Sequence, residues 1–324
     1  MTLKRKLQYG RWLLSAIANE RTSRAEELIK LGADVTLQDA VGANALYLAL
    51  AHGCHSLVEL LLEAGADPNS QGPYSSYPIH LAAGSGREDA PKLLELLIAN
   101  GAQIDTRDEE GATAIFLAGK HAREETIRTL QRHGGDLNDR NNQLDTSLTF
   151  ACCWGRTDRA RMLLDLGIDI EAQDDCKMRA LHWAARDGHV DTVELLISRG
   201  AQVNIADEWG YTPLIYAAMY GSLRCVNCLL DAGSDPKARC HDHRSALDCA
   251  RQFSGRDLAD AMTEHYHEFS VKNQNEQFNI RRYENQFGEP AVRIGTDSKN
   301  FEGWSLERCD CFGAIVKLLE NLPN

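Results

Sequence analysis

The fold is decided by the stretch Asp207-Glu208-Trp209-Gly210-Tyr211-Thr212-Pro213-Leu214-Ile215-Tyr216-Ala217-Ala218-Met219-Tyr220-Gly221 and its continuation to Leu229-Leu230 and Gly233. Thr212 can cap a helix by accepting from its first free N–H groups. Pro213 suits the first helical position, where its missing N–H costs nothing. Gly233 can adopt the left-handed conformation that ends a second helix. The stretch therefore predicts a turn followed by two short helices.

The same unit recurs along most of the chain. Its closing glycine appears at Gly32, Gly65, Gly101, Gly134, Gly167, Gly200 and Gly233. The period is 33 residues with one step of 36, and self-similarity at such a period predicts a solenoid. The longer step has extra residues around Arg87–Pro91. Because Asp89-Ala90-Pro91 has the pattern of a helix start, we expect the insertion to lengthen the turn between two helices.

The repeat resembles the ankyrin repeat. The resemblance rests on Gly210-Tyr211-Thr212-Pro213-Leu214, on the Ala-Ala and Leu-Leu pairs, and on closing motifs such as Gly65-Ala66-Asp67. It implies an all-α solenoid of about eight stacked helix–turn–helix units with β-turn fingers. We expect an N-terminal tail over residues 1–8, the solenoid over 9–268 and a C-terminal extension over 269–324. The resemblance also implies that His80 and His182 are structural and bind backbone between fingers.

The C-terminal extension lacks the repeat. Phe278–Tyr283 and Ala291–Ile294 predict a hairpin with a longer loop. Leu306, Cys309, Phe312, Val316 and Leu319 recur at helical spacing, with Ser305 as a candidate cap. We expect the hairpin and the helix to pack on the last repeat as a cap, with docking to a second protein as the alternative. The segment Ser305–Pro323 also faintly resembles the start of a SOCS box, which would make it a docking element for a ubiquitin ligase.

Composition narrows the classes of function. The formal net charge of −12 disfavours nucleic-acid backbones and suits basic or neutral partners. No apolar run is long enough to cross a membrane. Ten scattered cysteines are expected to be reduced thiols, which places the protein in the cytoplasm or nucleus. We expect it to be monomeric by itself.

Sequence motifs typical of catalysis or metal binding are weak, so we predict no catalytic residue, no metal and no cofactor. Cys225 and Cys228 have redox spacing but fall at buried positions of an outer helix. Cys240, His241, His243 and Cys249 could contribute zinc ligands, but Cys249 lies inside a helix. His265 and His267 point to different faces of a helix. Phosphate-binding loops and nucleophile elbows are missing from the sequence.

The resemblance implies that partners bind the fingers and the exposed positions of the inner helices, which form the concave face. On repeats five to eight these positions collect aromatic, methionine and acidic side chains, which favours a binding surface. The predicted partner-binding residues are Trp154, Asp175, Met178, Asp187, Glu208, Trp209, Tyr211, Met219, Tyr220 and Phe253. They suit a protein or peptide with apolar anchors and basic flanks.

The sequence therefore predicts a non-enzymatic adaptor or scaffold that acts by protein–protein binding. A first alternative is a substrate receptor of a ubiquitin ligase that docks through the C-terminal extension. A second is an enzyme that uses the ankyrin groove as its pocket, with acidic and histidine side chains of repeats four to six. A third, by resemblance, is that Asn204 is hydroxylated by a cellular enzyme.

Overall fold

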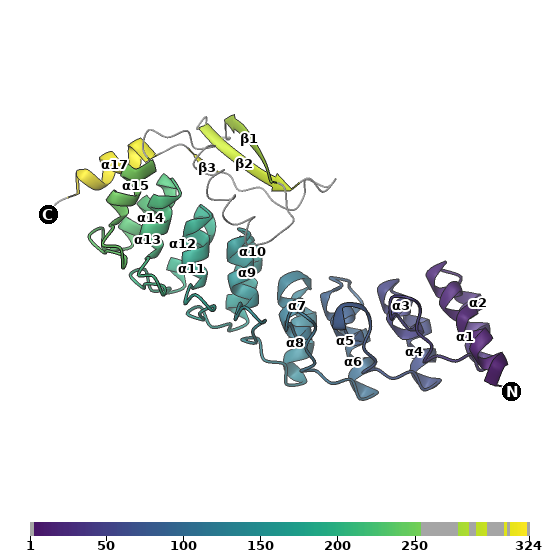
Figure 1. The fold of residues 1–324 in the computed structure, drawn as a ribbon. Helices are drawn as coiled ribbons and strands as arrows, with labels where there is room; N and C mark the ends of the chain where they lie inside the picture. The colour runs from purple at the N-terminus through teal and green to yellow at the C-terminus, as the bar shows by residue number, and fades with distance from the viewer. Residues whose placement is uncertain (1–2, 254–277, 285–289, 297–307, 310–311, 323–324) are drawn as a thin grey trace. The chain divides into compact units, whose positions relative to one another are not determined.

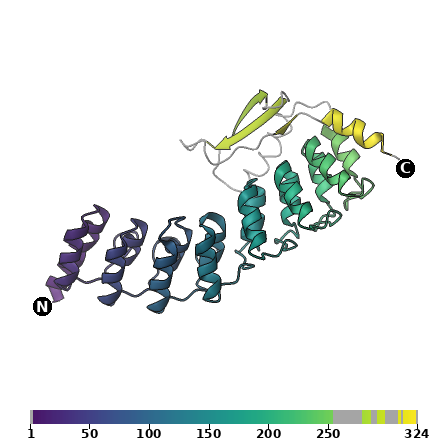
Figure 2. The same ribbon diagram turned by 180° about the vertical axis from the view of Figure 1, so that it is seen from behind.

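The computed structural model describes residues 3–253, 278–284, 290–296, 308–309 and 312–322. The chain divides into two compact units, Met1–Ser147 (unit 1) and Leu148–Asn324 (unit 2). In each unit, short antiparallel helix pairs stand side by side, which is visible from both sides of the molecule (Figures 1 and 2). The predicted all-α solenoid is confirmed.

Unit 1 holds four helix pairs. In chain order its helices are α1 (Leu3–Ala18), α2 (Thr22–Lys30), α3 (Ala45–Ala51), α4 (His55–Glu63), α5 (Pro78–Gly84), α6 (Ala90–Ala99), α7 (Ala114–His121) and α8 (Glu124–Arg132), with a short 3-10 turn η1 (Pro73–Ser75). The inner helices α1, α3, α5 and α7 pack on one another in sequence order, and the outer helices α2 and α4 do the same. Fully buried leucines and isoleucines fill the space between the layers, among them Leu28, Leu61 and Leu94.

Unit 2 continues the same pattern. Its helices are α9 (Ser147–Cys153), whose first residue belongs to unit 1, α10 (Thr157–Asp165), α11 (Ala180–Arg186), α12 (Val190–Ser198), α13 (Pro213–Met219), α14 (Leu223–Asp231), α15 (Ala246–Phe253) and α17 (Phe312–Glu320). The inner helices α11, α13 and α15 stack in order, as do the outer helices α10, α12 and α14. Both layers are thus built by nearest-neighbour packing, as in other solenoids.

The predicted helix ends are confirmed. All seven closing glycines have positive φ, between 77° at Gly32 and 97° at Gly134. A Cβ at Gly65 or Gly233 would meet nothing within 4 Å, so conformation and not space requires glycine there. The Thr212 side chain accepts from the backbone N–H of Ile215 at 3.3 Å. Helix α6 begins at Ala90 with Pro91 in its first turn, so the insertion does lengthen a helix–helix turn.

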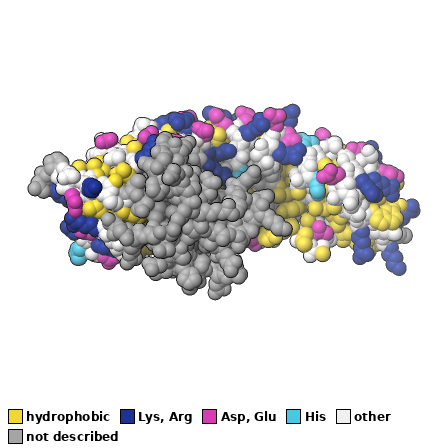
Figure 3. All heavy atoms as spheres, turned by 90° about the horizontal axis from the view of Figure 1, so that it is seen from above, with side chains coloured by type: hydrophobic (Ala, Val, Ile, Leu, Met, Phe, Trp, Pro, Cys, Tyr) yellow, Lys and Arg dark blue, Asp and Glu magenta, His cyan; other side chains and the backbone are white. Residues whose placement is uncertain are grey.

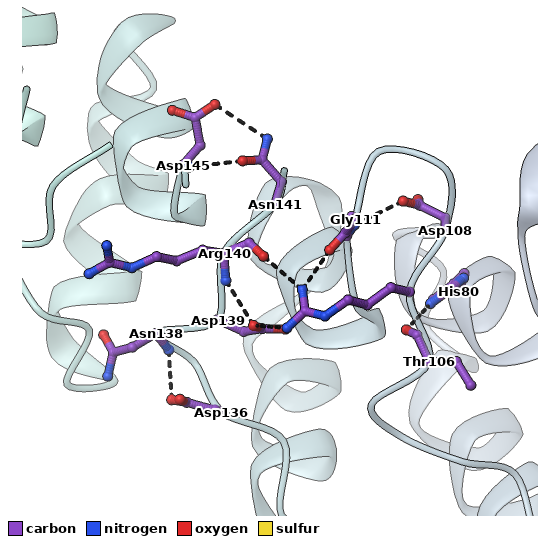
Figure 4. A network of polar contacts seen from close by, with 12 residues as sticks. His80, Thr106, Asp108, Gly111, Asp136, Asn138, Asp139, Arg140, Asn141 and Asp145 are labelled. Carbon is purple, nitrogen blue, oxygen red and sulfur yellow. Dashed lines mark hydrogen bonds and ion pairs between the residues drawn. The ribbon is translucent and has the colours of Figure 1, made fainter. Parts of the chain in front are cut away.

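Neighbouring repeats are joined by polar contacts near the fingers. In unit 1, Nε2 of His80 lies 2.8 Å from the carbonyl oxygen of Thr106 (Figure 4). The Arg107 guanidinium reaches the carbonyl oxygens of Gly111 and Arg140 at 2.6 and 2.7 Å and a carboxylate oxygen of Asp139 at 2.6 Å. One arginine therefore holds two successive fingers together.

His182 repeats the role of His80 in unit 2. Its Nε2 lies 3.1 Å from the carbonyl oxygen of Ile205, and its Nδ1 accepts from the N–H of Arg179 at 3.0 Å. Because Nδ1 accepts, Nε2 carries the proton and donates. Burial lowers the pKa of His182 to about 4, which keeps the ring neutral. The predicted structural role of both histidines is confirmed.

The C-terminal extension contains a hairpin and a helix. Strands β1 (Phe278–Glu284) and β2 (Pro290–Thr296) pair antiparallel, with Ile280 opposite Ile294. Helix α17 packs on α15 and α14 and buries Phe312, Ile315 and Leu319. Its Glu320 pairs with Arg251 of α15 at 2.7 Å. A helix of the extension thus covers the last repeat that the structure describes.

Two boundaries differ from the prediction. Residues 308–309 form strand β3 (Arg308–Cys309), which pairs with β2, so the C-terminal helix begins only at Phe312. Its buried face is set by Ile315 and not by the predicted Val316. At the other end, Leu3 to Gln8 are helical and belong to α1, where the sequence indicated a tail. Leu306, His265 and His267 lie outside the described residues.

Candidate functional site

The fingers of repeats six and seven are closed by an aspartate at their first position. Oδ1 of Asp207 accepts from the N–H groups of Trp209 and Tyr211 at 2.9 and 2.8 Å. Asp174 binds the N–H groups of Cys176 and Met178 in the same way, at 2.9 and 2.8 Å. Both carboxylates are buried. A short polar side chain that caps its own turn in this way fixes the turn conformation.

Each of these two aspartates also accepts a hydrogen bond from an aromatic side chain of the inner helix that follows its finger in the same repeat. The Tyr216 hydroxyl donates to Oδ2 of Asp207 at 2.7 Å, and Nε1 of Trp183 donates to Oδ2 of Asp174 at 2.8 Å. Burial and the hydrogen bond to Asp207 raise the pKa of Tyr216, so the phenol stays protonated. We call these two contacts the finger latches. Sequence reasoning missed them, although the nine-residue spacing of Asp174 to Trp183 and Asp207 to Tyr216 repeats after 33 residues.

Adjacent finger tips are also joined by backbone. The N–H of Glu208 donates to the carbonyl oxygen of Cys176 at 3.1 Å, and the N–H of His241 donates to that of Trp209 at 2.9 Å. The backbone of Glu208 and Trp209 is thus bonded to the fingers on both sides, while the Trp209 residue remains 44% exposed. Asp175 and Glu208 are exposed beside it. We call Asp175, Glu208 and Trp209 the finger surface.

Three other predicted residues lie below the finger tips. Tyr211, Met219 and Tyr220 are half-buried. The Tyr211 hydroxyl accepts from Arg244 at 2.7 Å, and its ring lies 5.3 Å from that of Tyr216. Burial raises the pKa of Tyr211 to about 12. The Tyr220 ring lies 6.3 Å from that of Tyr216, and all three side chains keep some exposed surface.

Two predicted contact residues are buried, so their expected exposure was wrong. Met178 is 4% exposed because it closes the finger of repeat six and contacts the Tyr216 hydroxyl through its sulfur. Asp187 is 1% exposed and pairs with Nε of Arg186 at 3.0 Å. That guanidinium also stacks on the Trp183 ring at 4.1 Å. Although burial opposes the charge, Asp187 holds the pKa of Arg186 above its usual range.

The two remaining predicted residues lie away from the finger surface or outside the described side chains. Trp154 follows α9, is half-buried, and has its ring 5.8 Å from that of Phe150. It belongs to the helix–helix turn of repeat five and not to a finger. Phe253 ends α15, and its side chain lies outside the described part of the chain. The structure therefore brings together Asp175, Glu208, Trp209 and Tyr211.

The residues that could hold a metal are engaged elsewhere. In the described ranges, Asp174, Asp175 and Cys176 bring three ligand atoms within 4.8 Å of one another. However, both carboxylate oxygens of Asp174 already accept hydrogen bonds within the finger. Burial and the neighbouring carboxylates raise the pKa of the Cys176 thiol to about 12, so without a cation the thiol stays protonated. In this structure the group serves to close the finger.

Four further thiols, those of Cys152, Cys225, Cys228 and Cys249, occupy buried or half-buried positions. Cys152 and Cys225 are fully buried, and Cys228 is half-buried with its sulfur 3.5 Å from a carboxylate oxygen of Glu194. Burial raises the pKa of Cys225 to about 12 and that of Cys249 to about 11. Such thiols are poor nucleophiles near neutral pH, because the reactive form is the thiolate.

A depression of about 460 Å³ lies in unit 1. It is lined by Ala102, Gln103, Ile104, Asp105, Thr106, His133 and Gly134. His133 is already paired with Glu95 at 2.7 Å. The Thr106 hydroxyl donates to the carbonyl oxygen of Gln103 at 3.3 Å, so the hydroxyl and the imidazole of this depression are each bonded to other groups.

Comparison with known proteins identifies the family. A model of ankyrin repeats matches the chain three times, over residues 13–95, 79–174 and 169–240. The chain belongs to the ankyrin-repeat family, whose repeats typically mediate protein–protein interaction. The crystal structure of the ankyrin repeat domain of Bcl-3, a member of the IkappaB protein family, matches with a TM-score of 0.58 at 25% identity. That match covers 67% of this chain and 97% of the other.

Similar sequences occur within much longer proteins. Inversin of Canis lupus familiaris is 32% identical over 129 residues, which is 39% of this chain and 12% of inversin. The E3 ubiquitin-protein ligase KEG of Arabidopsis thaliana is 29% identical over 116 residues, 34% of this chain and 7% of that protein. The chain thus spans a small part of these relatives. Among its described helices, none has the length and apolar character needed to cross a bilayer.

Proposed function

We propose that this ankyrin-repeat protein is a non-enzymatic adaptor that binds a protein partner through the finger surface of unit 2. The observation that carries the proposal is Trp209, which is 44% exposed on a finger fixed by a buried aspartate and an aromatic latch. Tryptophan is enriched among the residues that dominate binding energy. A side chain on a preformed support loses little conformational entropy when a partner binds.

The chemistry around Trp209 specifies the kind of partner. Asp175 and Glu208 are exposed beside the indole, and in the described part of the chain neither forms an ion pair. A partner with an apolar anchor would cover the indole. Lysine or arginine residues next to that anchor would meet the two carboxylates, which favours association and register. Tyr211 and Met219 would supply further apolar contact at the base of the fingers.

The alternatives gain less support. As a docking element for a ubiquitin ligase, the C-terminal helix would need a free apolar face, whereas Phe312, Ile315 and Leu319 of α17 are buried. The ligase name belongs to a relative that this chain matches over 7% of its length. The enzyme alternative would need a nucleophile hydrogen-bonded to its base, whereas in the depression of unit 1 the Thr106 hydroxyl donates to the carbonyl oxygen of Gln103 and His133 is paired with Glu95.

The proposal is tested by selecting peptides from a random display library on the full chain. We expect enriched sequences with a large apolar residue flanked by lysine or arginine. Glu208→Lys should weaken the selected peptides about tenfold or more, because reversal turns an attraction into a repulsion. Glu109→Lys changes an exposed glutamate of finger four and serves as the matched control. Equal affinity of the two variants for every selected peptide would refute the proposal.

A further inference from the structure

Helix α1 has an unusual charge for this chain. Lys4, Arg5, Lys6 and Arg11 are exposed on it, and it contains no acidic residue. The whole chain carries a formal net charge of −12, so the part outside α1 carries −16. None of the four cationic groups pairs with a carboxylate in the ranges that the structure describes. Figure 3 shows basic and hydrophobic side chains side by side at this end of unit 1.

The first turns of α1 extend beyond the layer of inner helices. Helix α1 has 16 residues, whereas the inner helices α3 and α5 have 7 each. Its N-terminal turns expose Leu3 at 73% and Leu7 at 38%. Trp12, one turn beyond Gln8, is 45% exposed. The helix therefore offers apolar anchors with basic flanks on a preformed segment.

The position of α1 is fixed at its middle. The carbonyl oxygen of Lys6 accepts from the N–H of Asp34 at 3.2 Å. A Cβ at Gly10 would lie 2.8 Å from the carbonyl oxygen of Asp34, so glycine allows this close approach. The exposed turns are thus held in place by the segment that follows α2, and their ordering costs little entropy when a partner binds.

We propose that a second copy of this chain binds the finger surface of unit 2, and that α1 of that copy is the bound segment. The inference rests on the proposed function, because it names a partner for the same surface. The charges are complementary: α1 carries four cations without a described carboxylate partner, and the finger surface carries Asp175 and Glu208 without a described ion-pair partner. Leu7 or Trp12 of one copy would cover the Trp209 indole of the other.

Such a contact joins two different surfaces of the same molecule. A heterologous contact of this type does not close on itself unless the rotation between copies happens to form a ring. The predicted product is therefore a series of head-to-tail oligomers that grows with protein concentration. Salt should shorten the series, because exposed charges are screened within about 10 Å at 0.1 M ionic strength.

The test uses sedimentation velocity of the full chain and two charge-reversal variants. The donor variant is Lys4→Glu with Lys6→Glu, and the acceptor variant is Asp175→Lys with Glu208→Lys. Each alone should weaken self-association at least about tenfold. An equimolar mixture should associate again, because the acceptor variant supplies an intact α1, the donor variant supplies an intact finger surface, and the two reversed surfaces carry opposite charges.

The matched control for the donor variant is Lys30→Glu with Lys92→Glu, which makes the same change in net charge on exposed positions of α2 and α6. It should associate like the wild type. The proposal is overturned if the mass of the wild type stays constant with concentration, or if the mixture does not associate. It is also overturned if the chain stays monomeric and α1 instead carries it to phosphatidylserine vesicles. If self-association fails but library peptides still bind and lose affinity in Glu208→Lys, only the self-association proposal is refuted and the adaptor function stands. If they do not bind either, both proposals fail.

Discussion

The Tyr216 hydroxyl lies 2.7 Å from Oδ2 of Asp207, and this contact ties the finger of repeat seven to the helix behind it. The other oxygen of Asp207 holds the N–H groups of Trp209 and Tyr211. One buried carboxylate therefore connects the exposed indole to the core of unit 2. The function that we propose depends on this rigidity, because a loosely held indole would lose affinity to ordering.

Removing the Tyr216 latch should cost stability. Tyr216→Phe leaves one oxygen of a buried carboxylate without its donor, and such a loss costs about 1–3 kcal/mol of unfolding free energy. Urea unfolding followed by circular dichroism measures it. Tyr9→Phe is the control, since the hydroxyl of the half-buried Tyr9 meets Arg5 in an exposed contact. An unchanged midpoint for Tyr216→Phe would mean that the contact does not support the finger.

Asn204 joins repeats six and seven. Its Nδ2 donates to the carbonyl oxygen of Gly233 at 3.0 Å, and its Oδ1 accepts from the N–H of Asp235 at 2.7 Å. Asn204→Ala removes both bonds and should lower the unfolding free energy by about 1–3 kcal/mol. Asn69→Ala should act equally in unit 1, because Asn69 binds Gly101 and Gln103 in the same manner. A loss confined to one of the two variants would contradict this shared role.

The hydroxylation of Asn204 stays a prediction. Intact-mass analysis of protein from its native cells, which would show an added oxygen, is the measurement that decides it.

Stability should fall on mild acidification because of His182. Burial lowers its folded pKa to about 4, below the ordinary value of 6.5. Between these values the unfolded chain binds the proton and the folded chain does not, so stability is full above pH 6.5 and declines as the pH falls toward 4. One such group contributes a slope of about 1.4 kcal/mol per pH unit within that window.

His182→Gln tests the assignment. This variant should be less stable at pH 7, where it loses the histidine contacts, and should show a flatter decline between pH 6.5 and 4. Urea midpoints at several pH values give both quantities. A decline as steep as that of the wild type would assign the acid sensitivity to other groups.

The finger of repeat five contains a strained leucine. Leu144 has φ of 60°, at the position where fingers four and seven have Gly111 and Gly210. A leucine in the left-handed conformation destabilises the folded state by about 1–2 kcal/mol. Glycine avoids this strain but loses more backbone entropy on folding, which offsets part of the gain. Leu144→Gly should therefore raise the unfolding free energy by about 0.5–1 kcal/mol. Leu144→Ala keeps the Cβ and should not do so; equal effects of both variants would exclude strain as the cause.

Much of the fold could be predicted because the repeat fixes the backbone at few positions. A glycine with positive φ closes the outer helix, a threonine can cap a helix start and a proline suits the first helical turn, so Gly233, Thr212 and Pro213 locate the elements of repeat seven without tertiary information. The secondary structure of the C-terminal extension was harder to predict. Cys309 fits the helical spacing of the residues that follow it, but Arg308 and Cys309 pair with β2 in a sheet.

The site could be predicted only in part, because exposure depends on contacts between repeats. Met178 and Asp187 occupy positions that are free in the repeat pattern, yet Tyr216 and Arg186 cover or bind them. The finger latches leave a trace in the sequence as an aspartate and an aromatic residue nine positions apart. In repeat eight the same positions are Cys240 and Cys249, so the trace is confined to two repeats and is easily overlooked.

The most direct test compares two exposed aromatic residues on finger tips. Trp209 in unit 2 is 44% exposed, and Tyr74 in unit 1 is 76% exposed. Calorimetry gives the affinity of library-selected peptides for Trp209→Ala and Tyr74→Ala. The comparison distinguishes binding at the finger surface from nonspecific binding to any exposed aromatic residue on a finger tip. We predict a loss of about 2 kcal/mol or more for Trp209→Ala and wild-type affinity for Tyr74→Ala. Wild-type affinity of Trp209→Ala, or an equal loss in both variants, would contradict the assignment of the binding surface.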